Sequence, residues 1–221
     1  SISNLTISFI NAISVVLFPV MRRIRKENVA NWYLPIRNII MLLLFLALFL
    51  YYPIDWLLPK WLPQYASSMI YLAVLFPMCA YEGKFELLIS TFFKTIRLEQ
   101  SLLITNLLTL CLSSSLTILC VLYFNSLNLL MFSIIMTLGC RSSFAELYLG
   151  KKLGVKVGRR IISENLLIID FVFGSWFIKG LAGLLMYLIG FGIYVLIYGG
   201  KIKETIIFMS LKQEGGIKYS G

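Results

Sequence analysis

The chain has 221 residues, of which 59% are apolar and 14% are charged, whereas soluble domains carry about 25% charged residues. Such a chain has too little polar surface to be solvated on all sides, so the composition predicts an all-α, polytopic membrane protein. The net charge of +10 does not indicate a nucleic-acid partner, because the basic residues form short clusters between apolar runs, as expected beside the inner leaflet of a membrane.

The histidine and cysteine content argues against an enzyme or a metal site. No histidine is present to act as a general base or a zinc ligand. The cysteines lie inside apolar runs without C-x-x-C spacing, so we expect free thiols at Cys79, Cys111, Cys120 and Cys140. Nucleotide-binding and nucleophile-elbow motifs are also missing. The sequence therefore predicts no catalytic residues, no metal and no cofactor.

About seven segments are apolar and long enough to cross a ~30 Å hydrocarbon core. The expected spans are residues 1–21, 36–58, 66–83, 101–124, 127–149, 161–178 and 181–199. Basic residues gather after the first, third and fifth spans and in the C-terminal tail, while the other connections carry few. By the positive-inside rule, this alternation predicts that Ser1 lies outside and that the C-terminus is cytoplasmic.

The stretch 81–100 is the least regular part of this topology. Charged residues interrupt its apolar sequence: Glu82, Lys84, Glu86 and Lys94. We expect the third span to continue into an amphipathic cytoplasmic helix. The alternative, a separate span, would reverse the orientation of everything after it.

Charged residues inside the spans are candidates for function, because each costs about 2.5–3.5 kcal/mol to insert at the bilayer centre. Asp170, near the middle of the sixth span, either carries a proton or a cation or, as a neutral group, hydrogen-bonds a neighbouring helix. Arg141 either binds an anionic substrate group in a water-filled pathway or extends toward the inner headgroups. Arg37 and Glu164 begin spans, so we expect them to anchor at the inner interface.

Two spans also carry regular polar stripes. Ser1, Asn4, Ser8 and Asn11 recur on one face of the first span, where two Asn side chains favour a cavity lining. In the fourth span, hydroxyl residues repeat every four positions and Asn106 lies beside them. That stripe consists of Ser101, Thr105, Thr109, Ser113 and Thr117. For this second stripe we favour helix packing over a cavity lining.

Four segments carry a resemblance to a known family. They are ISFINAISVVLFPVMRRIRKEN, YYPIDWLLPKWLPQYASS, LISTFFKTIRLEQSLLITNLLTL, and the C-terminal stretch from AELYLGKKLGV through IISENLLIIDFVFGSWFI to GLAGLLMYLIGFGIYVLIYGGKI. Together they resemble the Wzx-type flippases of lipid-linked oligosaccharides, in the MOP superfamily. The resemblance covers residues 1–205 and rests mostly on hydrophobic pattern.

This resemblance implies a two-lobed helical fold that works by alternating access. Residues 1–150 would form most of the C-terminal lobe with five spans, and 151–221 an appended helix pair with a basic cytoplasmic tail; the N-terminal lobe would be absent from the chain. The substrate would be an undecaprenyl-diphosphate-linked oligosaccharide, flipped to the outer leaflet of the bacterial cytoplasmic membrane for O-antigen or capsule synthesis. Asn4, Ser8, Asn11 and Arg141 would face the cavity.

The same resemblance implies partners and an energy source. Glycosyltransferases and a polymerase would be neighbouring machinery, and a proton or sodium gradient would drive transport. Asp170 is the ion-coupling candidate, although its place in the appended pair favours packing. Two other classes stay open: a membrane assembly or anchoring subunit, and a multidrug or metabolite exporter of the same superfamily. Such an exporter would require a cavity acid, for which Glu146 is the candidate in the first five spans.

Overall fold

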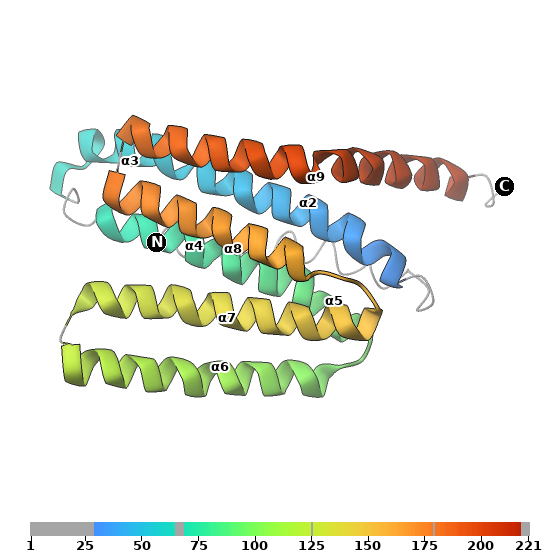
Figure 1. Cartoon of the computed structure of the whole chain (residues 1–221), viewed down its shortest axis with the longest axis horizontal. Helices are drawn as coiled ribbons and strands as arrows, with labels where there is room; N and C mark the ends of the chain where they lie inside the picture. Colours follow the sequence, from blue (N-terminus) through green and yellow to red (C-terminus); the bar gives the residue numbers. More distant parts are fainter. Residues whose placement is uncertain (1–28, 65–68, 125, 179, 218–221) are drawn as a thin grey trace.

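A computed structural model describes residues 29–64, 69–124, 126–178 and 180–217, and it is helical throughout apart from short connections (Figure 1). The α-helices are α2 (Val29–Phe49), α3 (Tyr51–Trp61), α4 (Met69–Gly83), α5 (Thr91–Thr95), α6 (Glu99–Leu119), α7 (Leu127–Leu153), α8 (Gly158–Phe173) and α9 (Gly180–Ile217). Three π-helical segments continue α4, α6 and α8: η3 (Lys84–Ser90), η4 (Cys120–Phe124) and η5 (Gly174–Ile178).

Within the described ranges, five helices are long and apolar enough to cross a membrane. They are Val29–Trp61, Glu99–Tyr123, Asn128–Leu153, Gly158–Ile178 and Gly180–Gly200. The prediction of a polytopic helical membrane protein is thus confirmed at this level. The first expected span, 1–21, lies outside the described residues, and the third corresponds to α4. The count of seven and the orientation stay predictions.

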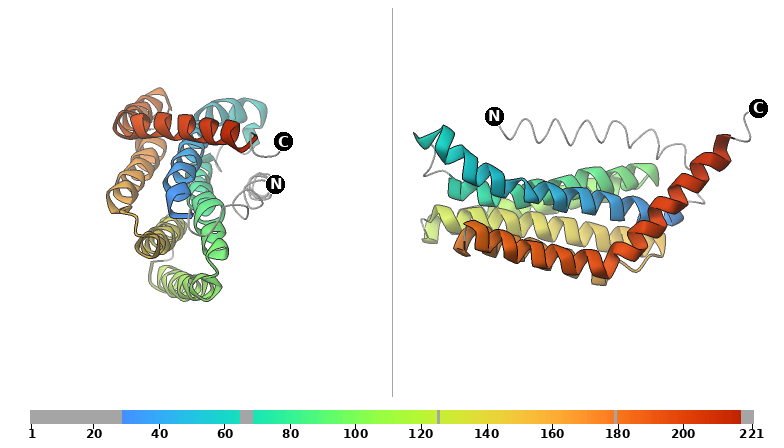
Figure 2. Two further views of the ribbon diagram at one scale, coloured as in Figure 1. Left: turned by 90° about the vertical axis from the view of Figure 1, so that its right-hand side faces the viewer. Right: turned by 90° about the horizontal axis from the view of Figure 1, so that it is seen from above.

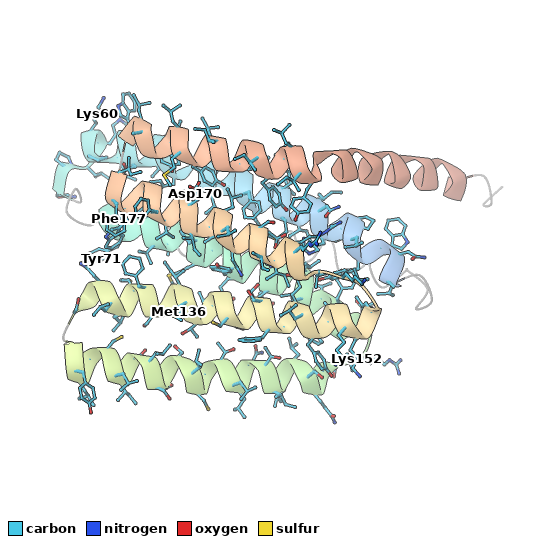
Figure 3. All side chains as sticks on the ribbon, in the orientation of Figure 1. Lys60, Tyr71, Met136, Lys152, Asp170 and Phe177 are labelled. Carbon is cyan, nitrogen blue, oxygen red and sulfur yellow. The ribbon has the colours of Figure 1, made fainter. Side chains whose placement is uncertain are left out.

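The long helices run side by side, and their ends define two ends of the bundle. Lys60 and Lys152 mark these opposite ends (Figure 3). The α5–α6 and α7–α8 connections, which carry the basic clusters, lie at the same end as Lys152 (Figure 1). We call this the basic end. Helix α9 has 38 residues and projects past the bundle at the basic end (Figure 2), so most of the expected tail is helical.

The segment after α4 differs from the sequence prediction. It continues α4 as expected, but η3 and α5 pack inside the bundle against α2 and α7 instead of lying on the cytoplasmic surface of the membrane. Phe85, Leu88 and Phe92 are fully buried there. They belong to a hydrophobic cluster with residues of α2, α7 and α8. The charged residues of 81–100 misled the prediction, because some of them are neutralised within the bundle rather than by water.

Helix α6 stands apart from this core. It lies at the edge of the bundle against α7 (Figures 1 and 2), and none of its residues is buried. The backbone turns sharply before it, because Arg97 takes a left-handed conformation with φ of 58° and the Leu98 amide bonds back to the Phe93 carbonyl. The membrane, or a partner surface, must therefore cover most of α6.

Helices α8 and α9 approach each other closely through glycine. At Gly183 of α9, a Cβ would overlap the backbone of Gly174. Nearby aromatic rings from α3, α8 and α9 are in mutual contact: Phe171 packs edge to face on both Tyr52 and Tyr187, and the rings of Tyr52 and Tyr187 are tilted against each other. Since only small residues permit such backbone contact in a membrane bundle, this contact fixes the position of α9.

Candidate functional site

Four charged side chains from four helical segments meet in the interior of the bundle. Arg37 of α2 contacts Glu146 of α7 through Nε, and its Nη1 lies 2.6 Å from Oε1 of Glu164 on α8. Lys84 of η3 lies 2.6 Å from Glu146 Oε2 and 2.9 Å from Glu164 Oε2. We call these four residues the buried quartet. Each cation contacts both carboxylates, so the quartet is closed and its formal charges cancel.

Two tyrosines complete the quartet. The Tyr33 hydroxyl donates to Glu146 Oε1 at 3.2 Å, and the Tyr194 hydroxyl donates to Glu164 Oε1 at 3.4 Å. All four charged side chains are at most 2% exposed. Buried ions require partners, and removing one partner from such a set costs about 3–5 kcal/mol. The quartet therefore ties α2, η3, α7 and α8 together and leaves no open position for a ligand.

The quartet corrects the expectation that Arg37 and Glu164 anchor at the membrane interface. Both residues are fully buried and bond to each other across the bundle. The sequence did contain a usable signal, since it places two basic and two acidic residues near the basic ends of different spans. Charges at membrane depth generally pair with one another.

A second cluster lies on the other side of α4 and α7. Arg141 Nη1 donates to Glu82 Oε1 at 2.9 Å, and Arg141 Nη2 donates to Asn106 Oδ1 at 2.9 Å. The guanidinium also lies over the ring of Phe85, with Cζ 3.6 Å from the ring centroid. We call Arg141, Glu82 and Asn106 the Arg141 triad. Its partners come from α4 and α6, so it connects the edge helix to the core.

Unlike the buried quartet, the Arg141 triad is partly exposed. The side chain of Arg141 is 14% exposed and that of Glu82 is 39% exposed. Arg141 lies about 20 Å along α7 from either helix end, near the middle of a helix that is long and apolar enough to cross a membrane. Arg141 Nε is buried and donates to no acceptor within the described residues. The structure thus places a partly exposed ion pair, with a donor that has no acceptor among the described residues, near the middle of a candidate membrane span.

Two hollows border Arg141. The first, of about 380 Å³, lies between α6 and α7 and is lined mostly by apolar groups, including Leu108 and Phe144. The second, of about 430 Å³, is more polar and is lined by Asn106, Ser113 and Ser114 of α6. Arg141 lines both hollows. A molecule with an anionic group and an apolar chain would find both kinds of surface there.

The hydroxyl stripe of the fourth span contributes to these hollows. Ser101, Thr105 and Thr109 line the first hollow, and Ser113 lines the second. Thr105 and Thr109 also donate to carbonyls one turn earlier in their own helix. These bonds within the helix, together with the bond from the Ser101 hydroxyl to the Tyr148 hydroxyl of α7, agree with the packing interpretation that we favoured from the sequence, and the same stripe also borders the two hollows.

A short polar chain links the helices between the two clusters. The Tyr81 hydroxyl of α4 donates to Oδ1 of Asn165 on α8, at 3.1 Å. Asn165 Nδ2 in turn donates to the Ser143 hydroxyl of α7, at 3.0 Å. Periodicity within one helix cannot reveal such bonds, since they join residues far apart in sequence.

The remaining site candidates do not join either cluster. Asn4, Ser8 and Asn11 lie outside the described residues. Asp170 lies on α8 (Figure 3), with its carboxylate beside Gly190 of α9. Its Oδ2 is buried with no hydrogen-bond partner in the described part of the chain. Of the site candidates that lie within the described residues, Arg141 is therefore the one in a polar cluster beside a groove.

The helices define the chain as a multi-pass helical membrane protein. No family model, no curated protein and no solved structure matches it.

Proposed function

We propose that the chain is part of a membrane transporter that flips a polyprenyl-diphosphate-linked oligosaccharide across the bacterial cytoplasmic membrane. The Arg141 triad is the observation that supports this proposal. A partly exposed ion pair about 20 Å from the helix ends is unfavourable against lipid, because charges in hydrocarbon are costly. The face that carries the triad therefore borders a water-filled cavity.

The chemistry around Arg141 fits an anionic lipid. A guanidinium binds phosphate oxygens with two parallel hydrogen bonds, and Arg141 Nε has a donor to spare among the described groups. The apolar hollow between α6 and α7 suits an isoprenoid chain, while the polar hollow at Ser113 suits the sugar end of the same molecule. One guanidinium would thus hold the junction between chain and sugar.

Alternating access requires one rigid part and one surface that moves against it. The buried quartet makes α2, η3, α7 and α8 the rigid part of this lobe. The opposite wall of the cavity is supplied by a second helical lobe, as in the family that the sequence resembles. A proton or sodium gradient drives the cycle.

The multidrug or metabolite exporter is less well supported. Its cationic substrates would require an acidic side chain in the cavity, and Glu146 was the sequence candidate. Glu146 is instead fully buried and bonded to Arg37 and Lys84. The acid beside the groove is Glu82, and Arg141 neutralises it.

A membrane assembly subunit is the second candidate function. The absence of buried residues on α6 favours it, since a helix that packs on one neighbour and leaves its other faces exposed suits packing against a partner. In that case the polar residues beside α6 would hydrogen-bond to partner helices. The two functions differ in what Arg141 does: a transporter requires its charge for substrate, whereas an assembly subunit requires it for complex formation.

Export in the host cell tests the proposal. Arg141→Gln removes the charge and is expected to lower surface polysaccharide at least tenfold, because a lost charge-assisted hydrogen bond is worth about 1.5–3 kcal/mol. Lipid-linked precursor should accumulate on the inner leaflet. Arg159→Gln, at an exposed position of α8, is the matched control and should export normally. Normal export by the Arg141→Gln variant at normal protein level would contradict the proposal.

A further inference from the structure

Glu82 occupies the place on Arg141 that an anionic substrate group would take. We propose that Glu82 is the residue that couples substrate binding to protons: the substrate phosphate displaces Glu82 from Arg141, and Glu82 then takes up a proton from water. This inference rests on the proposed function. It assigns a specific role to a carboxylate that the sequence interpretation left aside.

The geometry of the pair favours displacement of Glu82 rather than movement of Arg141. Arg141 is held by Asn106 through Nη2 and by the Phe85 ring beneath the guanidinium, and its side chain is only 14% exposed. Glu82 is 39% exposed, and among the described residues its carboxylate is bonded to Arg141. A guanidinium forms two parallel bonds to a phosphate at its Nη1–Nη2 edge, and a phosphate there would require Glu82 to leave Nη1.

The balance of charges explains why Glu82 takes up a proton once it is displaced. In the resting state the charges of Arg141 and Glu82 cancel. When a phosphate oxygen takes over Nη1, Glu82 is left as a carboxylate without its cation at membrane depth, which is a costly state. Proton uptake converts this carboxylate to a neutral carboxylic acid. No other bond forms or breaks, and the diphosphate diester keeps its charge.

Among the residues that the structure describes, the groups around Glu82 offer no replacement cation. Apart from Arg141, the charged residues that α2, α7 and α8 direct toward this part of the bundle belong to the buried quartet, whose members are bonded to one another. Glu86, one turn along the same stretch, is a second carboxyl group and so offers no cation. Asp55 of α3 and Asp170 of α8 lie near Tyr52, at the other end of the bundle from the basic clusters. The amide of Asn106 is uncharged.

The sign of the pH dependence follows from this exchange. The bound state holds one proton more than the free state, so binding is stronger at low pH. Where free Glu82 is ionised and bound Glu82 is protonated, the apparent Kd rises about tenfold for each unit of pH. Replacing Glu82 by Gln removes the titrating group and should abolish this dependence.

Calorimetry on the full chain in phosphatidylcholine nanodiscs tests the inference. The probe is a short polyprenyl diphosphate N-acetylglucosamine, whose diphosphate diester stays ionised between about pH 6 and 8. Titrations in two buffers with different protonation enthalpies count the protons taken up on binding. The wild type and Glu86→Gln should each take up about one proton, while Glu82→Gln should bind with no uptake and a constant Kd. Glu86 is an exposed carboxylate on the same helical stretch, so it is the matched control.

The outcomes separate this inference from the proposed function. If the wild type does not bind the probe, the proposed function fails and the coupling role fails with it. If the wild type binds without proton uptake, or if Glu82→Gln still takes up a proton, only the coupling role is overturned. Should Glu82→Gln fail to fold, infrared difference spectra of the wild type decide: a protonated carboxyl band must appear when the probe binds, and its absence overturns the coupling role.

Discussion

Arg141 and Glu146 lie five residues apart on α7 and belong to two different ion clusters. Arg141 bonds Glu82 and Asn106 on the exposed side, whereas Glu146 bonds Arg37 and Lys84 in the core. The helical stretch of α4 and η3 divides its charges in the same way, because Glu82 faces Arg141 and Lys84 faces the quartet. The buried quartet and the Arg141 triad therefore lie on opposite sides of α7 and the α4–η3 stretch. The quartet is buried, and the triad is partly exposed.

The buried quartet should stabilise the fold. Arg37→Met leaves two carboxylates with one cation and should lower the free energy of unfolding by about 3–5 kcal/mol. Lys94→Met, at an exposed position of α5, should change it by less than about 0.5 kcal/mol. Equilibrium unfolding in mixed micelles measures both. Equal stability of the two variants would show that the quartet does not hold the helices together.

Charge balance within the quartet makes a second prediction. The double variant Arg37→Met, Glu146→Gln removes one cation and one anion, so Lys84 and Glu164 remain as a balanced pair. It should unfold less easily than Arg37→Met alone, because the uncompensated charge is gone. The same unfolding titration tests this, and a double variant that is no more stable than Arg37→Met would contradict the account.

Much of the fold could be predicted from the sequence, but the clusters could not. Apolar runs of about 20 residues predicted α7 and α8 to within a few residues, because a membrane span has to satisfy its own backbone and is therefore helical. The sequence did not predict whether each charged side chain points into the bundle or to its exposed surface. Lys84 and Glu82 lie two residues apart in a stretch that we expected to continue as an amphipathic cytoplasmic helix, yet Lys84 is buried among partners from distant helices.

Close packing of α8 on α9 can be tested with two glycines of the same helix. Gly183→Ala places a methyl group against the Gly174 backbone, so the helices must separate and the melting temperature should fall by several degrees. A Cβ at Gly192 meets no atom within 4 Å in the described structure, so Gly192→Ala should leave the melting temperature unchanged or raise it slightly. If Gly183→Ala is as stable as Gly192→Ala, then the α8–α9 contact is looser than described.

Measuring water access beside α6 tests whether the Arg141 triad borders a water-filled cavity. In a cysteine-free background, Ser113→Cys lies in the polar hollow and should react with a membrane-impermeant thiol reagent in native membranes. Leu107→Cys is 60% exposed in the structure but belongs to the apolar surface of α6, so lipid should protect it. Equal protection of both cysteines would mean that the face of α6 with the triad lies against lipid or a partner protein.

A binding titration tests the central claim, which is that Arg141 binds the anionic headgroup of the substrate. The full chain in nanodiscs is titrated with the polyprenyl diphosphate sugar at one fixed pH, as the wild type, as Arg141→Gln and as the control Arg159→Gln. We predict that Arg141→Gln raises the Kd at least tenfold, as expected for about 1.5–3 kcal/mol of lost charge-assisted hydrogen bonding, while Arg159→Gln binds like the wild type. An unchanged Kd in the folded Arg141→Gln variant would contradict the account.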